Sequence, residues 1–403
     1  MAWCIEPFIN ASHTTDGHYQ PCCIAQVDKT AGRTTENLTP IEAMNTQYMQ
    51  DLRAEMNAGT PGKLVNHACS NCIFNESHGV KSRRQKQNNK YQNEKTMATV
   101  NRTTSDPSSA IVKQDLEYVN LKMLGNICNL KCVMCNPASS SKIAAEYKKH
   151  GMLAATQPMI ANPMATDNRV NYLNNILEIL ETVNRFSLIG GEAFVHPDFE
   201  YIFEKILTVK NIHKLELFII TNGTVIPDYV LKSADRFKNL LISFSVDGIG
   251  KKAEYIRTGT EWEVVDENIK LTLQSNASIG FNVTGQVLNA GYLHEVYDYI
   301  VNSLGLPAET ASWDNIVTNP QMHNMINLPD KLKEQYLSAY NDSGMLAIPG
   351  LKTQINTLKL PQQSSLEFTR FIKNRHQFDK IRNTDLLECY PEFIDYQYLL
   401  ENK

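Results

Sequence analysis

The sequence contains no apolar run of about 18 residues, so we expect no membrane-spanning helix. Its N-terminus, MAWCIEPF, has neither a basic segment nor an apolar core segment, so we expect no secretory signal and a cytoplasmic location. Positive charge is not in excess either, because 39 Lys and Arg stand against 43 Asp and Glu, a net charge of −4. This balance argues against a protein whose whole surface binds nucleic acid or anionic membranes.

Cysteines, in contrast, are present in clusters. There are nine, an odd number: Cys4, Cys22, Cys23, Cys69, Cys72, Cys128, Cys132, Cys135 and Cys389. A disulfide framework is typical of short secreted chains, whereas this chain of 403 residues is long enough for one large domain and one or two small ones. In a reducing compartment, closely spaced cysteines more often bind a metal or an iron–sulfur cluster. We expect Cys389, in the apolar segment LLECYPEF, to be a buried inert thiol.

The first part of the chain divides into two regions of different composition. Residues 1–77 contain five cysteines in two groups, separated by a helical pattern for which Thr39 is a suitable N-cap and Pro40 a suitable first residue. Residues 78–114 are polar, with eight Lys or Arg and two acidic residues between positions 81 and 113. They lack the apolar content of a core, so we interpret them as a basic solvated linker. The alternative is a basic arm that contacts a partner.

Strand-like and helix-like patterns alternate through residues 115–325. The expected strands are 118–122, 186–189, 214–220, 240–246, 279–288 and 313–317. Helical patterns fall between them, at 173–183, 197–209, 228–237, 264–273 and 293–304. Strands that alternate with helices predict a parallel sheet with right-handed crossovers. Six such units predict an α/β fold, a partial (βα)6 TIM-like barrel, followed by a helical C-terminal region at 326–403.

Three cysteines follow the first strand of this pattern in the segment LGNICNLKCVMCNP. Cys128, Cys132 and Cys135 have the spacing C-x3-C-x2-C, so one short loop supplies three thiolates. Three thiolates can bind three irons of a [4Fe–4S] cluster and leave the fourth iron free for another ligand. The alternatives are a zinc site or buried structural thiols, although zinc usually takes four ligands and the nearest downstream histidine, His150, is remote.

At this point the chain resembles the radical S-adenosylmethionine (radical SAM) superfamily, whose signature is this cysteine triplet after the first strand of a partial barrel. The resemblance implies that SAM binds the open iron of the cluster through its amino and carboxylate groups. The reduced cluster then cleaves SAM to methionine and a 5′-deoxyadenosyl radical, which abstracts a hydrogen atom from a substrate. A one-electron donor such as flavodoxin or ferredoxin is implied as a partner.

Further segments resemble SAM-binding motifs of the same superfamily. The second strand ends in Gly190-Gly191-Glu192, where the family's GGE motif binds the SAM amino group; a turn is the alternative. The third strand ends in TNGT, the fourth in SVDG, and an arginine follows in AEYIRTGT. The resemblance therefore implies cofactor-binding roles for Thr221, Asn222, Ser245, Asp247 and Arg257, with turn residues and helix caps as the alternative for the first four and Asn289 as a weaker candidate.

The N-terminal cysteines resemble the opening motif of the SPASM and twitch auxiliary-cluster domains. Cys4 and Cys22 have the spacing C-x12-G-x4-C, in which Gly17 lies in a turn between two strands that bring the thiols together. Cys69 and Cys72 then complete a four-thiolate site, which fits the shorter twitch version with one [4Fe–4S] cluster. Zinc remains an alternative metal, and Cys23 an alternative ligand to Cys22. In most relatives this module follows the barrel, whereas here residues 1–77 precede it.

These features predict a radical SAM enzyme with an N-terminal twitch-like module. The resemblance implies a peptide or protein side chain as substrate. Modification of RNA or of a small metabolite is a second interpretation, and the basic segment at 78–114 is the only feature that favours nucleic acid. A non-catalytic iron–sulfur or zinc protein that transfers electrons is a third. Glu192 and Arg257 separate the enzyme from this last alternative, because only a SAM-binding enzyme needs them beside the triplet.

Overall fold

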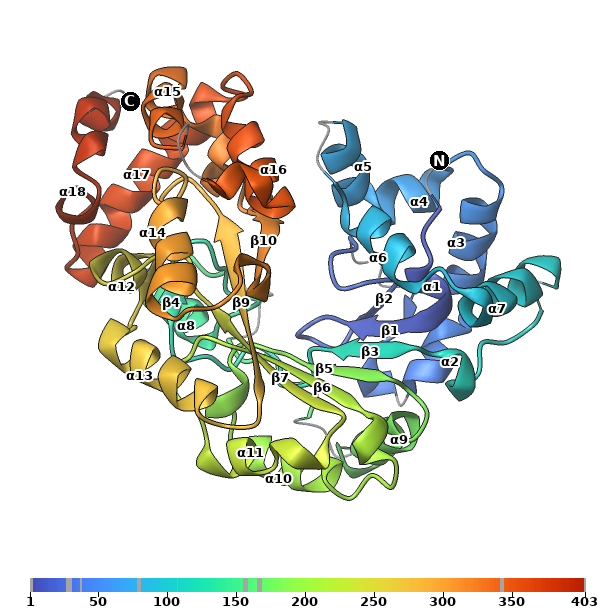
Figure 1. Ribbon diagram of the computed structural model, residues 1–403. Helices are drawn as coiled ribbons and strands as arrows, with labels where there is room; N and C mark the ends of the chain where they lie inside the picture. The colour runs from blue at the N-terminus through green and yellow to red at the C-terminus, as the bar shows by residue number, and fades with distance from the viewer. Residues whose placement is uncertain are drawn as a thin grey trace.

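The computed structural model describes residues 3–26, 31–36, 38–77, 81–106, 108–154, 159–164, 169–340 and 344–401. At its centre lies an open eight-stranded sheet with the strand order β10-β9-β7-β6-β5-β3-β1-β2 (Figure 1). Neighbouring strands are parallel except β1 and β2, which pair antiparallel. The strands are β1 (Asn10–His13), β2 (Tyr19–Gln20), β3 (Tyr118–Leu121), β5 (Arg185–Leu188), β6 (Glu216–Thr221), β7 (Asn239–Ser245), β9 (Ser278–Gly285) and β10 (Ala311–Ile316).

The six strands from β3 to β10 confirm the predicted partial barrel. Each of the six expected segments contains one strand of the sheet, and the connections between them are helical. The sheet does not close, because β10 and β2 form its two ends. All carboxyl ends of the parallel strands therefore meet at one rim, where such folds place their chemistry.

Helices cover the outer side of the barrel strands. Figure 1 shows α9, α10, α11 and α13 along this side, and α10 turns four apolar residues inward, Phe199, Ile202, Phe203 and Ile206. Apolar residues recur at helical spacing on α10, so one stripe faces the sheet. The barrel helices are α8 (Ser141–Lys149), α9 (Arg169–Leu180), α10 (Phe199–Ile206), α11 (Asp228–Lys232), α12 (Lys251–Ile256), α13 (Trp262–Leu273) and α14 (Leu293–Asp298).

The N-terminal region, for which a module at 1–77 was predicted, extends the barrel sheet. Strand β1 pairs in parallel with β3, from Asn10 opposite Tyr118 to His13 opposite Leu121. Without β1, the edge of β3 would present unpaired N–H and C=O groups. The helices of this region are α1 (Glu6–Ile9), α2 (Pro40–Met44), α3 (Gln47–Asn57), α4 (Lys63–Ala68) and α5 (Ser70–Ser77), and α2 begins as expected with Thr39 as its N-cap.

The segment 78–114 is not a solvated linker, and this prediction was wrong. Its described residues include α6 (Arg83–Tyr91) and α7 (Glu94–Ser105), while 78–80 and 107 lie outside the described residues. Both helices begin with capping boxes, at Ser82 and at Asn93, in which side chains satisfy the first backbone N–H groups. The missing apolar content is offset by ion pairs that join α6 to distant parts of the N-terminal region.

The C-terminal region is helical, as predicted. Its helix α16 packs against the edge strand β10, and the side-chain Nε2 of Gln354 donates to the carbonyl oxygen of Trp313 at 2.5 Å. The helix thus covers a sheet edge that would otherwise be exposed. No helix among the described residues has the length and apolar character needed to cross a membrane. The C-terminal helices are α15 (Asp330–Ser338), α16 (Pro349–Leu358), α17 (Ser365–Arg382) and α18 (Leu386–Cys389).

Candidate cofactor and substrate site

The predicted triplet and most of the predicted SAM-binding residues line one cavity of about 430 Å³, which we call the cysteine cavity. The three thiols come from the loop after β3, and the other residues come from the carboxyl ends of β5, β6 and β7 and from the short strand β8. The predicted residues that line it are Cys128, Cys132, Cys135, Gly190, Gly191, Glu192, Thr221, Asn222, Ser245 and Arg257. The fold therefore brings together residues that span more than a hundred positions of the sequence.

Glu192 is fixed by the strand next to its own. Thr221 Oγ1 donates to Glu192 Oε1 at 2.7 Å, and the Asn222 backbone N–H donates to Oε2 at 2.5 Å. The Phe194 backbone N–H also donates to Oε1, at 3.4 Å. Burial nevertheless raises the pKa of Glu192 to about 7, although these hydrogen bonds and the charge of Arg257 act in the opposite direction. A cationic or hydrogen-bond-donating ligand in the cavity would therefore stabilise the ionised form of Glu192.

The two glycines before Glu192 allow the cysteine loop to approach β5. A Cβ atom on Gly191 would lie 2.3 Å from the carbonyl oxygen of Ile127, and one on Gly190 would lie 2.7 Å from Cβ of Leu124. The Glu192 backbone N–H donates to that same Ile127 oxygen at 2.7 Å. The two glycines therefore permit a close approach to the backbone of the triplet loop.

A second, two-stranded sheet places Arg257 beside the triplet. Strand β4 (Lys131–Cys132) pairs antiparallel with β8 (Arg257–Thr258), so that Cys132 lies opposite Arg257. The guanidinium donates from Nη1 to Cys132 Sγ at 3.8 Å and from Nη2 to Asp247 Oδ2 at 2.5 Å. Its Nε is buried without a partner among the described residues. The Arg257 guanidinium thus lies close to the thiols, where it would stabilise the negative charge of thiolates bound to a metal cluster.

Asp247 and Asn289 lie behind Arg257 and outside the lining of the cysteine cavity. Asp247 is 1% exposed, pairs with Arg257 and accepts from the Thr284 backbone N–H at 2.8 Å. Asn289 donates to the carbonyl oxygens of Asp247 and Thr284 at 3.1 and 2.9 Å. The predicted cofactor contact of Asp247 stays a prediction, and in the structure its carboxylate pairs with Arg257.

The chemistry of the triplet fits a group that carries positive charge. Burial, together with the nearby charge of Cys132, raises the pKa of Cys128 and of Cys135 to about 12. Three thiols in a low-dielectric cavity cannot all ionise unless a cation lies among them. No three Cys, His, Asp or Glu side chains in the described ranges, the triplet included, surround a single metal ion. A cubane cluster would take each thiolate on a different iron.

The four N-terminal cysteines lie near enough to affect one another electrostatically, although no three of these described residues surround a single metal ion. The pKa of Cys4 is raised well above its usual value by burial and, to a smaller extent, by the charges of Glu6, Cys69 and Cys72, and that of Cys22 is raised by burial and by neighbours that include Cys4. The turn between β1 and β2 makes this possible. Gly17 adopts a φ of +82° there, and a Cβ atom at this position would lie 2.2 Å from Thr34 Oγ1. The expected hairpin with a glycine turn is confirmed.

Two arginines of α6 stand beside this quartet. Arg83 donates to both carboxylate oxygens of the buried Glu6, at 2.9 and 2.8 Å, and Arg84 pairs with Glu76 on α5. The charge of Arg84 lowers the pKa of Cys72 against the larger effect of burial. The basic segment that was expected to reach solvent or a partner thus supplies cations to the cysteine quartet.

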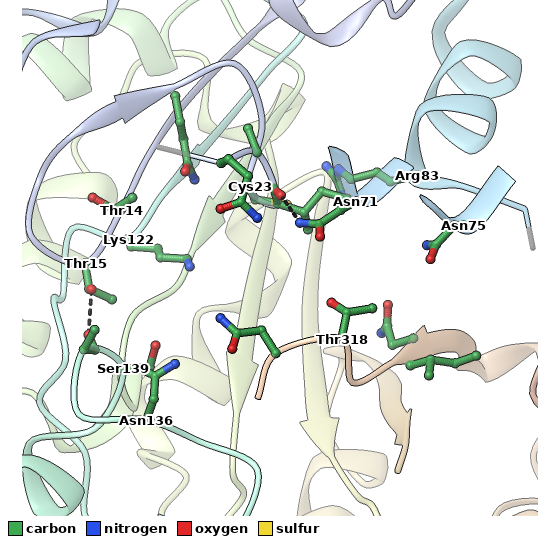
Figure 2. A pocket seen from close by; sticks show the side chains of 18 of the residues that line it. Thr14, Thr15, Cys23, Asn71, Asn75, Arg83, Lys122, Asn136, Ser139 and Thr318 are labelled. Atoms are coloured by element: carbon green, nitrogen blue, oxygen red, sulfur yellow. Dashed lines mark hydrogen bonds between the residues drawn. The ribbon is translucent and has the colours of Figure 1, made fainter. Parts of the chain in front are cut away.

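A larger cavity of about 810 Å³ lies between the N-terminal helices α5 and α6 and the strand β10, and we call it the large cavity (Figure 2). Cys23 lines it, whereas Cys22 does not. Four residues line both the large cavity and the cysteine cavity, so the two are adjacent: Lys122, Asn136, Ser139 and Asn319. None of these four was predicted as a site residue from the sequence, and the one signal for any of them is the position of Lys122 at the carboxyl end of the first barrel strand.

Cys389 departs from the prediction of a buried thiol. Its side chain is only partly buried at the end of α18, and its Sγ lies 3.7 Å from the carbonyl oxygen of Lys251. It lies apart from both cysteine groups and lines neither cavity.

Fold and site together define a partial-barrel protein with a three-thiol cavity at the carboxyl ends of its strands. Residues 123–300 match the family model of the radical SAM superfamily. This part of the chain is therefore a radical SAM domain, the domain of an enzyme class that works with a [4Fe–4S] cluster and SAM. The resemblance read from the sequence is thereby confirmed for the barrel.

Solved structures similar to this chain include anSMEcpe with bound AdoMet, at 17% identity and a TM-score of 0.40, with 56% of this chain and 60% of that chain covered. Another is Streptococcus suis SuiB bound to the precursor peptide SuiA, at 11% identity and a TM-score of 0.33, covering 87% of this chain and 68% of that one. The chain spans about 60% of the length of the structures that match first. A search of curated proteins found no match.

Proposed function

We propose that this protein is a radical SAM enzyme that cleaves SAM reductively and uses the 5′-deoxyadenosyl radical to abstract hydrogen from a peptide or protein side chain. One observation carries the proposal: the cysteine triplet, Glu192 and Arg257 line a single cavity that shares lining residues with a second, larger one. A cofactor bound in the first cavity would face a substrate bound in the second. A non-catalytic electron-transfer protein would need no such pair of cavities.

The residues of the cysteine cavity have distinct tasks in this proposal. When bound there, a reduced [4Fe–4S] cluster held by Cys128, Cys132 and Cys135 would supply the electron that breaks the C–S bond of SAM. Glu192 accepts hydrogen bonds from the SAM amino group, and Arg257 donates to its carboxylate. Thr221 and the Asn222 N–H hold the Glu192 carboxylate in place, and Asp247 holds the guanidinium.

The N-terminal quartet is proposed to hold the auxiliary [4Fe–4S] cluster. Cys4, Cys22, Cys69 and Cys72 would give it four protein ligands, so it would act as an electron relay or a structural clasp. The position of Cys23 in the lining of the large cavity supports Cys22 as the fourth ligand. Zinc is the competing occupant, and the metal content of the purified protein separates the two.

The size and position of the large cavity support a peptide substrate. Its volume of about 810 Å³ lies at the upper end of the range for pockets that bind drug-sized molecules. A one-electron donor of the flavodoxin or ferredoxin class would complete the reaction. The arginines Arg83 and Arg84 are paired with Glu6 and Glu76, so the feature that favoured RNA is largely occupied within the protein.

The decisive experiment is anaerobic reconstitution with iron and sulfide, reduction with dithionite and incubation with SAM. We expect 5′-deoxyadenosine and methionine in equal amounts, measured by liquid chromatography and mass spectrometry. A Cys389→Ser protein, changed at a thiol remote from both cysteine groups, should match the wild type. Absence of 5′-deoxyadenosine from a wild-type protein that holds about four irons at each cysteine group would contradict the proposal.

A further inference from the structure

An uncompensated ammonium group stands where the two cavities join. Lys122 follows β3 directly, and Figure 2 shows its side chain extending into the large cavity. It is half-buried, lines both cavities, and its Nζ has no hydrogen bond or ion pair with any described residue. A lysine that is partly removed from water gains from a negatively charged partner. Its place beside the cysteine triplet puts such a partner next to the reaction centre.

The acidic residues of the large cavity are already paired elsewhere. Asp314 pairs with Lys86 at 3.0 Å, and Asp16 pairs with His18 at 3.0 Å and with Arg33 at 3.8 Å. Glu6, which does not line the cavity, neutralises Arg83. The remaining lysine of the lining, Lys81, is exposed and has no carboxylate partner among the described residues. The cavity therefore presents excess positive charge to whatever enters it.

Amide side chains make up much of the rest of the lining. They are Gln20, Gln26, Asn71, Asn75, Gln87, Asn136, Asn315 and Asn319. A carboxamide both donates and accepts, as a peptide group does, so such a wall suits a polypeptide backbone. One amide is conspicuous: Asn136 Oδ1 is buried at the junction without a hydrogen-bond donor among the described residues. A buried acceptor of this kind is costly unless a ligand supplies an N–H.

We infer that Lys122 binds a carboxylate of the substrate and that the modified segment is an acidic peptide, with Asp or Glu at or beside the residue that loses hydrogen. The inference rests on the proposed function and narrows its substrate class. Lys122 Nζ donates to the carboxylate, and Asn136 Oδ1 accepts a peptide N–H of the same segment. A C-terminal carboxylate has the same chemistry, and the experiment separates it from a side-chain carboxylate.

The test is anaerobic binding of fluorescein-labelled peptides to the reconstituted full-length protein with SAM, followed by fluorescence anisotropy. Four decapeptides of Gly and Ser are compared. Three are amidated and carry a central Glu, Gln or Lys, and the fourth has no central charge and a free C-terminal carboxylate. We expect the Glu peptide to bind about tenfold more tightly than the Gln peptide, because a hydrogen bond to a charged group is lost in the latter. If only the fourth peptide bound tightly, Lys122 would still bind a carboxylate, but that carboxylate would be the C-terminus of the peptide and not a side chain.

The variants Lys122→Met and Lys122→Glu test the residue itself. Lys122→Met should bind the Glu and Gln peptides equally well, and Lys122→Glu should bind the Lys peptide more tightly than the Glu peptide. Lys238→Glu is the matched control, because Lys238 is exposed just before β7, at the opposite end of the strands from the cavities. It should keep the wild-type preference.

Three outcomes would overturn the inference: no binding of either carboxylate-bearing peptide, equal affinity for the Glu and Gln peptides without tight binding of the fourth, or a preference that survives in Lys122→Met. Loss of SAM binding in Lys122→Met, measured by equilibrium dialysis, would assign the ammonium to SAM and also overturn it. Failure of the proposed function looks different, since the wild type would then form no 5′-deoxyadenosine whether peptide is present or not.

Discussion

The two cysteine groups of this protein differ in the segments that supply their thiols and in whether a cavity adjoins them. The triplet comes from one short loop, and its thiols line a cavity together with Glu192 and Arg257. The N-terminal quartet is assembled from three separate segments, and neither Cys4, Cys22, Cys69 nor Cys72 lines either cavity. Three thiolates with a cavity leave room for an exogenous ligand, whereas four enclosed thiolates saturate their metal. The difference supports the proposed assignment of the reactive centre to the triplet and of a relay or clasp to the quartet.

Both cysteine groups have the same arrangement of charged side chains. Each has an arginine close to a cysteine, and each arginine is held by a buried or partly buried carboxylate: Arg257 by Asp247 and Arg84 by Glu76. The carboxylate fixes the direction of the guanidinium, and the guanidinium offsets negative charge on the thiolates. A cluster with several thiolate ligands is anionic, so a fixed cation nearby is expected to favour its binding.

Removal of the triplet should have the largest effect. In a protein with Cys128, Cys132 and Cys135 all changed to Ala, we expect no 5′-deoxyadenosine above background and a loss of about four irons per chain. The iron at the quartet should remain, because its ligands are separate. Iron analysis and product analysis of the same preparation provide the measurement. Loss of all iron would show that the two groups are not independent.

The adjacent thiols Cys22 and Cys23 offer a matched pair within the quartet. We expect Cys22→Ala to lose about four irons per chain and Cys23→Ala to keep the wild-type content, because only Cys23 lines the large cavity. Iron and acid-labile sulfide analysis after reconstitution distinguishes the two variants. The reverse result would make Cys23 the ligand and place Cys22 outside the cluster.

A change at Glu192 should weaken SAM binding without removing iron. We expect Glu192→Gln to raise the dissociation constant of SAM about tenfold, because a charge-assisted hydrogen bond is lost. Glu200→Gln, on the outer helix α10, serves as the control and should bind SAM normally.

The same residue predicts a pH dependence. Burial raises the pKa of Glu192 to about 7, and only the carboxylate form accepts hydrogen bonds at both oxygens, so SAM affinity should be full above this pH and fall about tenfold between pH 8 and pH 6. Equilibrium dialysis across this range checks the sign. A wild-type affinity that rises on acidification would contradict the assignment.

Ion pairs in the segment 78–114 should have the smallest effects, and they differ from one another. Arg84 is 5% exposed in its side chain, so we expect Arg84→Met to lower the free energy of unfolding by about 2 kcal/mol. Lys95, whose pair with Glu117 leaves it 59% exposed, is the control, and Lys95→Met should cost less than about 1 kcal/mol. Urea unfolding of the apo proteins gives both values. If both substitutions lowered the free energy of unfolding by the same small amount, the segment would be a loosely attached linker, as the sequence suggested.

The features that the sequence predicted correctly are local. The triplet spacing that carries the family resemblance and the six strands are each encoded in a few consecutive residues, and the barrel topology follows from their order. Even the hairpin that lies between Cys4 and Cys22 is signalled by the spacing around Gly17.

What the sequence did not predict depends on partners that lie far along the chain. From the sequence alone, Arg83 is expected to be exposed to solvent. Its burial depends on an ion pair with Glu6, which lies more than seventy positions earlier in the chain. The pairing of β1 with β3 and the position of Lys122 between two cavities are equally non-local. The motif around Asp247 shows the residue type and cannot show that its carboxylate pairs with Arg257.

Electron paramagnetic resonance of two reconstituted and reduced variants tests the central comparison most directly. One variant keeps only the triplet, with Cys4, Cys22, Cys69 and Cys72 changed to Ser, and the other keeps only the quartet. We predict that SAM changes the spectrum of the first and leaves that of the second unaltered, because only the triplet leaves an iron open. A spectrum that responds to SAM in the quartet-only protein, or that fails to respond in the triplet-only protein, would contradict this account.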